Sequence, residues 1–482
     1  MLNPPEGYAL ADLDAGKRFV SDLLAGESTR VEGDARWLDD VALPRDAHAA
    51  RVIRVTPHAS RGDAHALLIH PRSVVVALGD GDGDNDGEGL RDDARSVSAP
   101  DATGRARANA AAPARAASPD LPPLAARIAA ALAAHDLAPL ALAAVVAPAR
   151  RIAEQALTDA ARALRAPLRF VETNARDAAG VLDAALPAAL APRVDASRAA
   201  ARSPRTTPPE PRDVAIAVAR APVDADALGI ARGRLTVLGL GPGRADLMTP
   251  AARAALADAT DIVGYATYVN MAGPLRADQQ LHVSDNREEL QRARHAFELA
   301  ARGRRVAVVS SGDPGVFAMA AAVLEALDGA DDARWAAVEL DVVPGVSAAL
   351  ATAAEAGAPL GHDFCLISLS DNLKPWAIIE KRIDHAAAAD FALAFYNPVS
   401  RARPVQFDRA LDIVRRHRAP ETVVVLGRDI GRPGATLATT TLAALSAQQV
   451  DMRTMVVVGS STTRRVARDG ARDWVYTPRW YR

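Results

Sequence analysis

The chain has 482 residues, about three times a common domain length, so two or three domains are expected rather than one. Hydrophobic residues make up 49% and charged residues 24%, which argues against disorder of the whole chain. The 57 Lys and Arg residues nearly balance the 59 Asp and Glu residues, so the net charge of −2 does not predict a nucleic-acid-binding surface. The single cysteine, Cys365, excludes an intramolecular disulfide and any two-cysteine zinc or redox motif.

The amino-terminal segment shows no basic-then-apolar signal pattern, and no charge-free apolar run approaches the roughly 20 residues of a membrane span. Together with the cysteine count, this favours a cytoplasmic protein that does not enter a membrane.

The first 220 residues predict a small accessory α/β region that a loop divides into residues 1–79 and 123–220. Residues 80–122 are rich in Gly, Ala, Pro and charge without an apolar period, which predicts a disordered insertion. Residues 196–212 resemble a linker. The expected elements are helices near residues 10–25, 123–135 and 151–164, and strands at 65–79 and 213–220.

The acidic run within the insertion matches the first half of a calcium-binding loop at Asp82, Asp84 and Asp86. Gly89 stands where such loops place an apolar residue, and no helices flank the run. A solvated loop is therefore preferred over a calcium site.

From Arg234 onward, apolar strands alternate with amphipathic helices, which predicts a mainly parallel sheet covered by helices. After residue 362 strands outnumber helices, which predicts a second lobe with a mixed sheet. The expected strands are 234–241, 261–265, 304–313, 339–345, 363–371, 391–398, 422–429, 435–442, 454–460 and 473–481.

A glycine-rich turn at residues 239–243 joins the first of these strands to a helix that Thr249 caps and Pro250 opens. Glycines allow a tight bend and close approach of a ligand to the backbone. A dinucleotide-binding turn would need glycine where Arg244 stands, and no Gly-Lys-Ser/Thr follows for a phosphate loop. A turn that serves packing alone remains an alternative.

Two further strands end in similar turns, Ser-Ser-Gly-Asp-Pro-Gly at 310–315 and Pro-Gly-Val-Ser-Ala at 344–348. The carboxyl ends of parallel strands share one edge of a sheet, where α/β proteins bind ligands. In order and spacing, the three turns resemble the GxGPG, GDP and PGxSA segments of the tetrapyrrole (corrin/porphyrin) methylases.

The resemblance covers residues 234–482 and narrows to the branch that methylates precorrin-3B at C17. The segments that carry it are 284–294, 362–376, 395–403 and 427–434. It implies two lobes, an N-lobe at 234–361 and a C-lobe at 362–482, and a homodimer, since relatives pair through these lobes.

The resemblance also implies that S-adenosylmethionine binds between the turns and that precorrin-3B is converted to precorrin-4 in cobalamin biosynthesis. Many members carry methionine where Asn397 stands, so the backbone of Asn397 is the expected contact. The residues implied to contact the cofactor are Gly241, Pro242, Gly243, Ser311, Gly312, Asp313, Val316, Ser347, Ala348, Asn397 and Gly431.

Methyl transfer from a sulfonium requires positioning more than acid or base chemistry. The substrate carries many carboxylates, so basic side chains at the loop edges are candidates to bind them, although exposed arginines are common in this chain. Asp246 is the candidate for proton transfer, with helix capping as the alternative. Candidates for substrate binding are Arg244, Lys374, Arg401 and Arg403 by charge, and Tyr265 with Tyr268 by their flat rings, for which core packing is the alternative.

The histidines His282, His362 and His385 are isolated in sequence, so no metal site is predicted. His362 is expected to begin a strand beside the thiol of Cys365. The Gly-Ser-Ser at 459–461 is not the elbow of a serine hydrolase.

The N-terminal half resembles, more faintly, the middle and C-terminal parts of the protein that opens the lactone of a cobalt-precorrin. The matching segments are 7–37, 67–79 and 214–220. The family's own N-terminal segment is absent, and Gly79-Asp80-Gly81-Asp82 replaces its GxGCxxG motif. We expect a degenerate accessory domain that binds or channels corrinoid. Two alternatives to methylation of precorrin-3B at C17 remain for the whole chain. They are methylation of the cobalt-loaded counterpart of precorrin-3B and a non-catalytic corrinoid-binding role.

Overall fold

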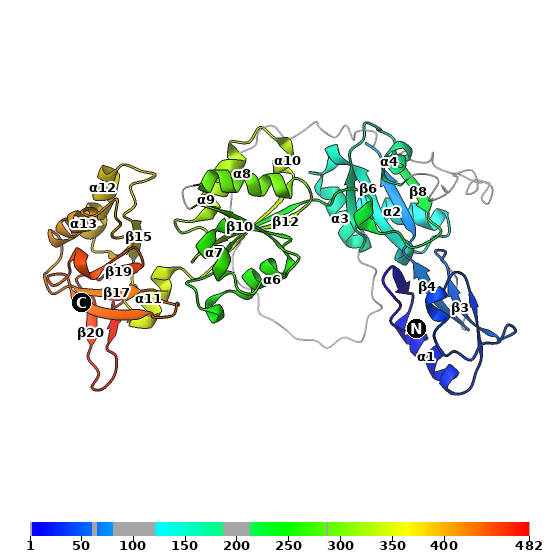
Figure 1. Ribbon diagram of the computed structural model, residues 1–482, viewed down its shortest axis with the longest axis horizontal. Helices are drawn as coiled ribbons and strands as arrows, with labels where there is room; N and C mark the ends of the chain where they lie inside the picture. The colour runs from blue at the N-terminus through cyan, green and yellow to red at the C-terminus, as the bar shows by residue number, and fades with distance from the viewer. Residues whose placement is uncertain (1, 60–64, 81–120, 187–212, 286–287, 482) are drawn as a thin grey trace, which may run out of the picture. The chain divides into compact units, whose positions relative to one another are not determined.

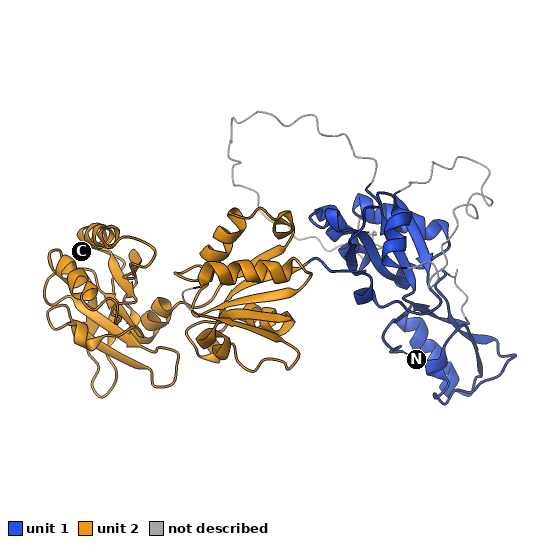
Figure 2. Cartoon of the chain, turned by 45° about the horizontal axis from the view of Figure 1, so that its top comes forward, with its two compact units in different colours: residues 1–232 blue, residues 233–482 orange. Residues whose placement is uncertain are grey.

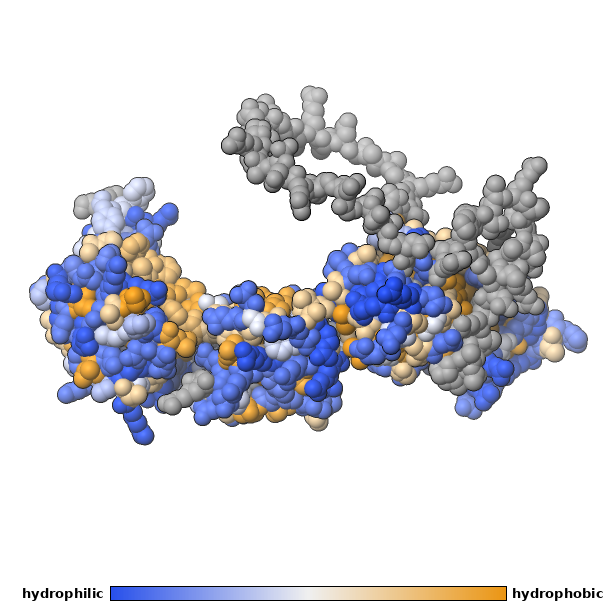
Figure 3. All heavy atoms as spheres, turned by 90° about the horizontal axis from the view of Figure 1, so that it is seen from above, coloured by the Kyte–Doolittle hydropathy of each residue, from blue (hydrophilic) through white to orange (hydrophobic). Residues whose placement is uncertain are grey.

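The computed structural model describes residues 2–59, 65–80, 121–186, 213–285 and 288–481. The chain forms two compact units, Met1–Arg232 and Gly233–Arg482 (Figure 2). Most of the predicted insertion, the calcium-like run and the whole predicted linker lie outside the described residues. Among the described residues, every helix is too short or too polar to cross a bilayer. On the face drawn in Figure 3, hydrophobic and hydrophilic residues are mixed over both units.

The first unit begins with a four-stranded sheet in the order β1-β4-β3-β2. Helix α1 packs on this sheet through Phe19 and Leu23, and the Asp12 side chain caps it by accepting from two backbone N–H groups. The bounds are β1 Tyr8–Leu10, α1 Leu13–Leu24, β2 Thr29–Glu32, β3 Arg51–Val55 and β4 Ala66–Pro71.

A second sheet of the first unit has the order β7-β6-β5-β8, with three helices packed around it. The bounds are β5 Val74–Leu78, α2 Pro123–Ala134, β6 Leu142–Pro148, α3 Gln155–Leu164, β7 Leu168–Val171, α4 Ala178–Ala185 and β8 Val214–Val218.

The prediction of one strand over residues 65–79 is wrong, because the chain leaves one sheet at Pro71 and enters the other at Val74. Strand β4 alternates between buried and partly exposed residues, whereas every residue of β5 is buried. Both patterns are apolar, so the sequence alone hides the break.

The first lobe of the second unit is a parallel sheet in the order β11-β10-β12-β9-β13, as predicted. Helices α8 and α9 pack around Phe297 on one face, and α6 and α7 cover the other (Figure 1). Strand β11 was not expected, because it is a largely exposed edge strand. The bounds are β9 Arg234–Gly239, α6 Pro250–Asp258, β10 Asp261–Tyr265, α7 Ala266–Met271, β11 Gln280–Ser284, α8 Glu289–Ala300, β12 Arg305–Ser310, α9 Met319–Asp328, α10 Ala333–Ala336 and β13 Glu339–Val343.

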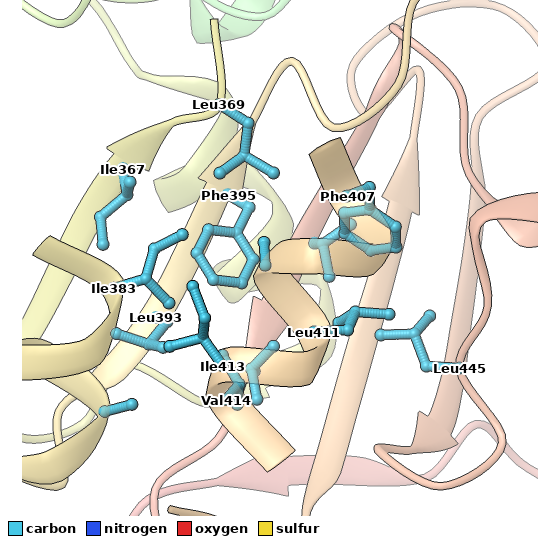
Figure 4. Packing of buried hydrophobic residues seen from close by; sticks show 14 of the residues in the cluster. Ile367, Leu369, Ile383, Leu393, Phe395, Phe407, Leu411, Ile413, Val414 and Leu445 are labelled. Atoms are coloured by element: carbon cyan, nitrogen blue, oxygen red, sulfur yellow. The ribbon is translucent and has the colours of Figure 1, made fainter. Parts of the chain in front are cut away.

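The second lobe has a mixed sheet, as predicted, in the order β15-β16-β19-β17-β18 with only its β15–β16 pair parallel. Helices α12 and α13 bury one face around Phe395 and Phe407 (Figure 4), each buried ring contributing about 1.5–3 kcal/mol. The bounds are β15 Phe364–Ser368, α12 Trp376–Ala388, β16 Ala392–Tyr396, α13 Gln406–Arg415, β17 Val423–Arg428, β18 Thr436–Thr441 and β19 Thr454–Val458.

Helix α11 (Ala348–Ala356) covers the other face of this mixed sheet through Ala349 and Ala356. By its packing, α11 therefore belongs to the second lobe. The expected boundary between the lobes, between residues 361 and 362, lies after this helix. A small sheet of β14 (Gly357–Ala358), β21 (Trp474–Tyr476) and β20 (Arg464–Val466) completes this lobe.

Candidate functional site

The three glycine turns of the first lobe meet through their backbones. Gly241 and Gly312 exchange two hydrogen bonds, of 3.1 Å from the Gly241 N–H and 2.8 Å from the Gly312 N–H. Both residues have positive φ, +73° and +69°, which favours glycine. A Cβ on Gly239 would lie 3.0 Å from the Cα of Gly345, so the first and third turns touch without room for a side chain.

The Asp313 carboxylate ties the second turn to the third. Its Oδ1 accepts a hydrogen bond from the N–H of Gly315 (2.8 Å), and its Oδ2 accepts one from the N–H of Gly345 (3.0 Å). Hydrogen bonds to a charged acceptor are the stronger kind, at about 1.5–3 kcal/mol each. Each oxygen keeps a free lone pair, so Asp313 holds the turns in place and can still accept a hydrogen bond from a ligand.

The third turn leads directly into helix α11. Ser347 is buried, and its Oγ caps the helix by accepting from the N–H of Leu350 (3.3 Å). In the first turn of α11, which Ala348 begins, the N–H of Ala349 donates to the Tyr396 hydroxyl (3.2 Å). Burial, and then the nearby Asp313 charge, raises the pKa of Tyr396, so this phenol stays protonated at neutral pH.

A loop of the second lobe packs against the first turn. A Cβ on Gly431, whose φ is +84°, would lie 2.8 Å from Cγ of Pro242, and one on Gly243 would lie 2.7 Å from Cγ of Arg432. Arg432 Nε donates to the carbonyl oxygen of Pro242 (3.1 Å), and its Nη2 donates to Ser311 Oγ (3.3 Å). This one guanidinium therefore binds two turns of the first lobe from the second lobe.

Sequence reasoning missed Arg432, although it stands within the 427–434 segment beside Gly431. The only available signal was that place, since arginine is abundant throughout the chain.

Val316 and Asn397 lie beside these turns. The Val316 N–H donates to the carbonyl oxygen of Asp313 (3.2 Å). Asn397 has a φ of +54°, which asparagine tolerates better than most residues, and its amide Nδ2 donates to Ser368 Oγ (3.1 Å). The Asn397 side chain is thus engaged within the lobe, which leaves its backbone for any ligand.

Arg244 and Asp246 form an exposed ion pair just beyond the first turn. Arg244 Nε donates to Asp246 Oδ1 (2.7 Å), and its Nη1 lies 3.8 Å from a Glu355 carboxylate oxygen. Thr249, not Asp246, caps α6 by accepting from the N–H of Ala252 (3.2 Å). The structure thus shows no capping of α6 by Asp246, whose exposed carboxylate pairs with Arg244.

The remaining candidates for substrate binding lie in different settings. Tyr265 and Tyr268 pack edge to face, with ring centroids 5.4 Å apart. Lys374 Nζ lies 6.0 Å from the centre of the Phe317 ring, and Arg401 is exposed.

Arg403 differs from the exposed cations, because it is only 6% exposed. Its Nη1 donates to the Leu369 carbonyl (2.9 Å), and its Nε lies 3.7 Å from Asp371 Oδ1. Arg403 therefore holds parts of the second lobe together. Its burial argues against the prediction that it binds a substrate carboxylate at the surface.

His282, which is isolated in sequence, has close side-chain neighbours in the structure. Its Nε2 lies 2.9 Å from Asp261 Oδ1, and its Nδ1 lies 3.0 Å from Nε2 of His295. Asp261 is fully buried and also accepts hydrogen bonds from Arg304 (2.6 Å) and Thr260 (2.7 Å). Asp261 opens β10 at the amino edge of the sheet, opposite the glycine turns, so this chain of side chains is separate from the candidate site.

The other two histidines bond within the second lobe. His362 Nε2 lies 2.9 Å from Ser460 Oγ, and Nδ1 of His385 lies 2.8 Å from the carbonyl oxygen of Lys381. Within the described part of the chain, no cluster of three or more His, Cys, Asp or Glu residues could hold a metal ion.

Comparisons with known proteins match the second unit to a known family. Residues 234–446 match the family Tetrapyrrole (Corrin/Porphyrin) Methylases. A precorrin-3B C(17)-methyltransferase of Sinorhizobium sp is 52% identical over 249 residues, which cover 52% of this chain and 97% of that protein. A probable cobalt-factor III C(17)-methyltransferase of Salmonella typhimurium is 41% identical over 247 residues, covering 51% of this chain and 99% of that protein.

The cobalamin biosynthesis protein CobIJ of Mycobacterium tuberculosis is 47% identical over 253 residues. That match covers 52% of this chain and 48% of CobIJ, so this chain matches only about half of that longer protein.

The fold and the site thus define a methyltransferase with a two-lobed α/β unit. The chain belongs to the tetrapyrrole methylases, and the Sinorhizobium and Salmonella relatives, which match over almost their whole length, are named as C(17)-methyltransferases.

Proposed function

We propose that this chain transfers a methyl group from S-adenosylmethionine to C17 of precorrin-3B, with ring contraction to precorrin-4. The observation that carries the proposal is the convergence of three glycine turns at one sheet edge, fixed by Asp313 and by Arg432 from the other lobe. The Sinorhizobium relative named for this reaction is 52% identical, which supports the choice of carbon and substrate.

The residues at the turns suit this cofactor. Backbone N–H and C=O groups lie at the carboxyl edge of a parallel sheet, where nucleoside ligands bind, and the glycines let the turns approach one another closely. The Asp313 carboxylate, which binds the N–H groups of Gly315 and Gly345, can also accept a hydrogen bond from a hydroxyl. When bound, the cofactor supplies a methyl group activated by its sulfonium.

The chain's own residues then act mainly by positioning. Asp313 and Arg432 fix the turns, and Tyr396 fixes the start of α11. Arg244, Lys374 and Arg401 are the cations proposed to bind substrate carboxylates. Asp246, which pairs with Arg244 just beyond the first turn, is the proposed proton-transfer residue.

Calorimetric titration with S-adenosylhomocysteine tests the donor site. Asp313→Ala should weaken binding sharply, because it removes the bond that ties the second turn to the third and the bond to Gly315 that shapes the second turn. Gly241→Val should do the same, since its Cβ would lie 2.8 Å from the Leu247 carbonyl at a φ of +73°. Asp328→Ala, at an exposed position on α9, is the control. Absence of binding by the unchanged chain would favour a non-catalytic corrinoid-binding protein.

Methylation of the cobalt-loaded counterpart is the second candidate, because the Salmonella relative carries that name at 41% identity. Turnover of precorrin-3B against cobalt-factor III separates the two. We also propose that the chain is cytoplasmic and that it forms a homodimer through its methylase lobes. Sedimentation of the purified chain would test the homodimer.

For the first unit we propose an accessory role in binding or channelling corrinoid. Arg150, which follows β6, donates to groups that follow β5 and β7, namely Asp80 Oδ1 (2.8 Å) and the carbonyl oxygens of Thr173 (2.8 Å) and Ala175 (2.6 Å). These bonds tie the described carboxyl ends of the parallel strands together, at the edge where such sheets bind ligands. The proposal fails if residues 1–222 alone bind no tetrapyrrole and their deletion leaves turnover unchanged.

A further inference from the structure

Phe317 holds a backbone conformation that its side chain makes costly. Its φ is +54°, in the left-handed region that bulky residues avoid. Among the described residues with positive φ other than glycine, it is the only aromatic one. Such strain persists where the surroundings impose it, and it occurs frequently at ligand-binding sites.

The Phe317 ring gains little from the protein interior, since the residue is 51% exposed. A core position would repay the backbone strain by removing the ring from water, but half of this residue remains accessible. Glycine would satisfy the same φ without cost. Packing within the chain therefore does not explain why a phenylalanine stands here.

The neighbours of Phe317 come from the other lobe. Its ring lies edge to face with that of Tyr396, with centroids 5.3 Å apart, and Lys374 Nζ lies 6.0 Å from its centroid. Tyr396 is itself fixed by the Ala349 N–H at the start of α11. The exposed ring thus stands beside the donor turns, next to a cation.

From this arrangement we infer that Phe317 is a positioning residue that stacks on the face of the tetrapyrrole, with Lys374 binding one of its carboxylates. A flat conjugated ring system edged with carboxylates matches an exposed aromatic face beside an ammonium group. The inference rests on the proposed function, because it takes the substrate from there, and it adds a residue that the family resemblance did not supply.

Steady-state methylation of precorrin-3B by the full chain tests this role. Phe317→Gly should raise KM for the tetrapyrrole about tenfold, which corresponds to the loss of one aromatic contact, while kcat changes less. Its affinity for S-adenosylhomocysteine and its melting temperature should stay at or above the wild-type values, because glycine relieves the strain. Phe317→Tyr should keep the low KM. Leu324→Ala, which removes an apolar side chain that is 50% exposed on α9, is the control.

Several results would overturn the inference. The first is an unchanged KM in Phe317→Gly. The second is a loss of S-adenosylhomocysteine affinity without a change in KM, which would place the ring against the donor. The third is a marked fall in melting temperature, which would show a packing role. Failure of the wild-type chain to methylate precorrin-3B would instead refute the proposed function, so the two failures are distinguishable.

Discussion

Gly345→Ala should disable the donor site while leaving the backbone conformation allowed, since Gly345 does not require positive φ. Its new Cβ would lie 2.9 Å from both Cα and O of Gly239 and closer still to the carbonyl oxygen of Gly312. Ordinary contact is 3.4–4 Å, so the third turn must move away from the first and second turns by the order of 1 Å. A misplacement of about 1 Å can reduce turnover about 100-fold. Overpacking should also lower the free energy of unfolding by about 1–3 kcal/mol.

The assay is kcat/KM for methyl transfer, paired with calorimetric titration of S-adenosylhomocysteine and thermal unfolding. Gly329→Ala is the matched control, because a Cβ there would lie 3.5 Å from its nearest neighbour at an ordinary backbone conformation. Wild-type affinity and turnover in Gly345→Ala would show that close contact between the turns is not needed, and would refute the reasoning.

Three further predictions concern single side chains. Arg432→Ala should weaken S-adenosylhomocysteine binding about tenfold in calorimetry, because it removes two hydrogen bonds between the lobes. The control Arg302→Ala, at an exposed position, should bind as the wild type does. Equal affinities in the two variants would show that the Arg432 bonds do not determine binding. Asp261→Asn should lower the free energy of unfolding by about 3 kcal/mol in urea titration. Burial tends to raise the pKa of Asp261, but its three side-chain hydrogen bonds outweigh burial and hold that pKa low. The stabilisation by the ionised carboxylate is therefore present above about pH 4 and is lost as the pH falls through the lower pKa of the folded state. An acid limb that is identical in Asp261→Asn would contradict this. Tyr396→Phe should cost about 1–2 kcal/mol in thermal unfolding by leaving the Ala349 N–H unpaired, and an unchanged melting temperature would count against that bond.

The glycine turns were predictable because each follows a strongly apolar strand. Parallel strands carry their carboxyl ends to one edge, so the meeting of Gly241, Gly312 and Gly345 followed from the order of strands and turns. The division into a parallel and a mixed sheet was also predictable, because helices between the strands become fewer after residue 362.

Side-chain partners across long sequence separations were not predictable. Arg432 bonds Ser311, which lies 121 residues earlier, and Asp261 meets His282 on the next strand. Nothing local distinguishes Arg403, which is buried, from Arg401, which is exposed. The break at Pro71 was missed because two apolar strands of different sheets follow each other almost without a gap.

The central claim is that the converging turns present a methyl donor to C17 of precorrin-3B. Its most direct test is incubation of the full chain with precorrin-3B and S-adenosylmethionine labelled in its methyl group, followed by NMR of the isolated product. One labelled methyl group at C17 of a contracted ring is the predicted result. A folded chain that binds S-adenosylhomocysteine but transfers no label, or transfers it to another carbon, would contradict the account.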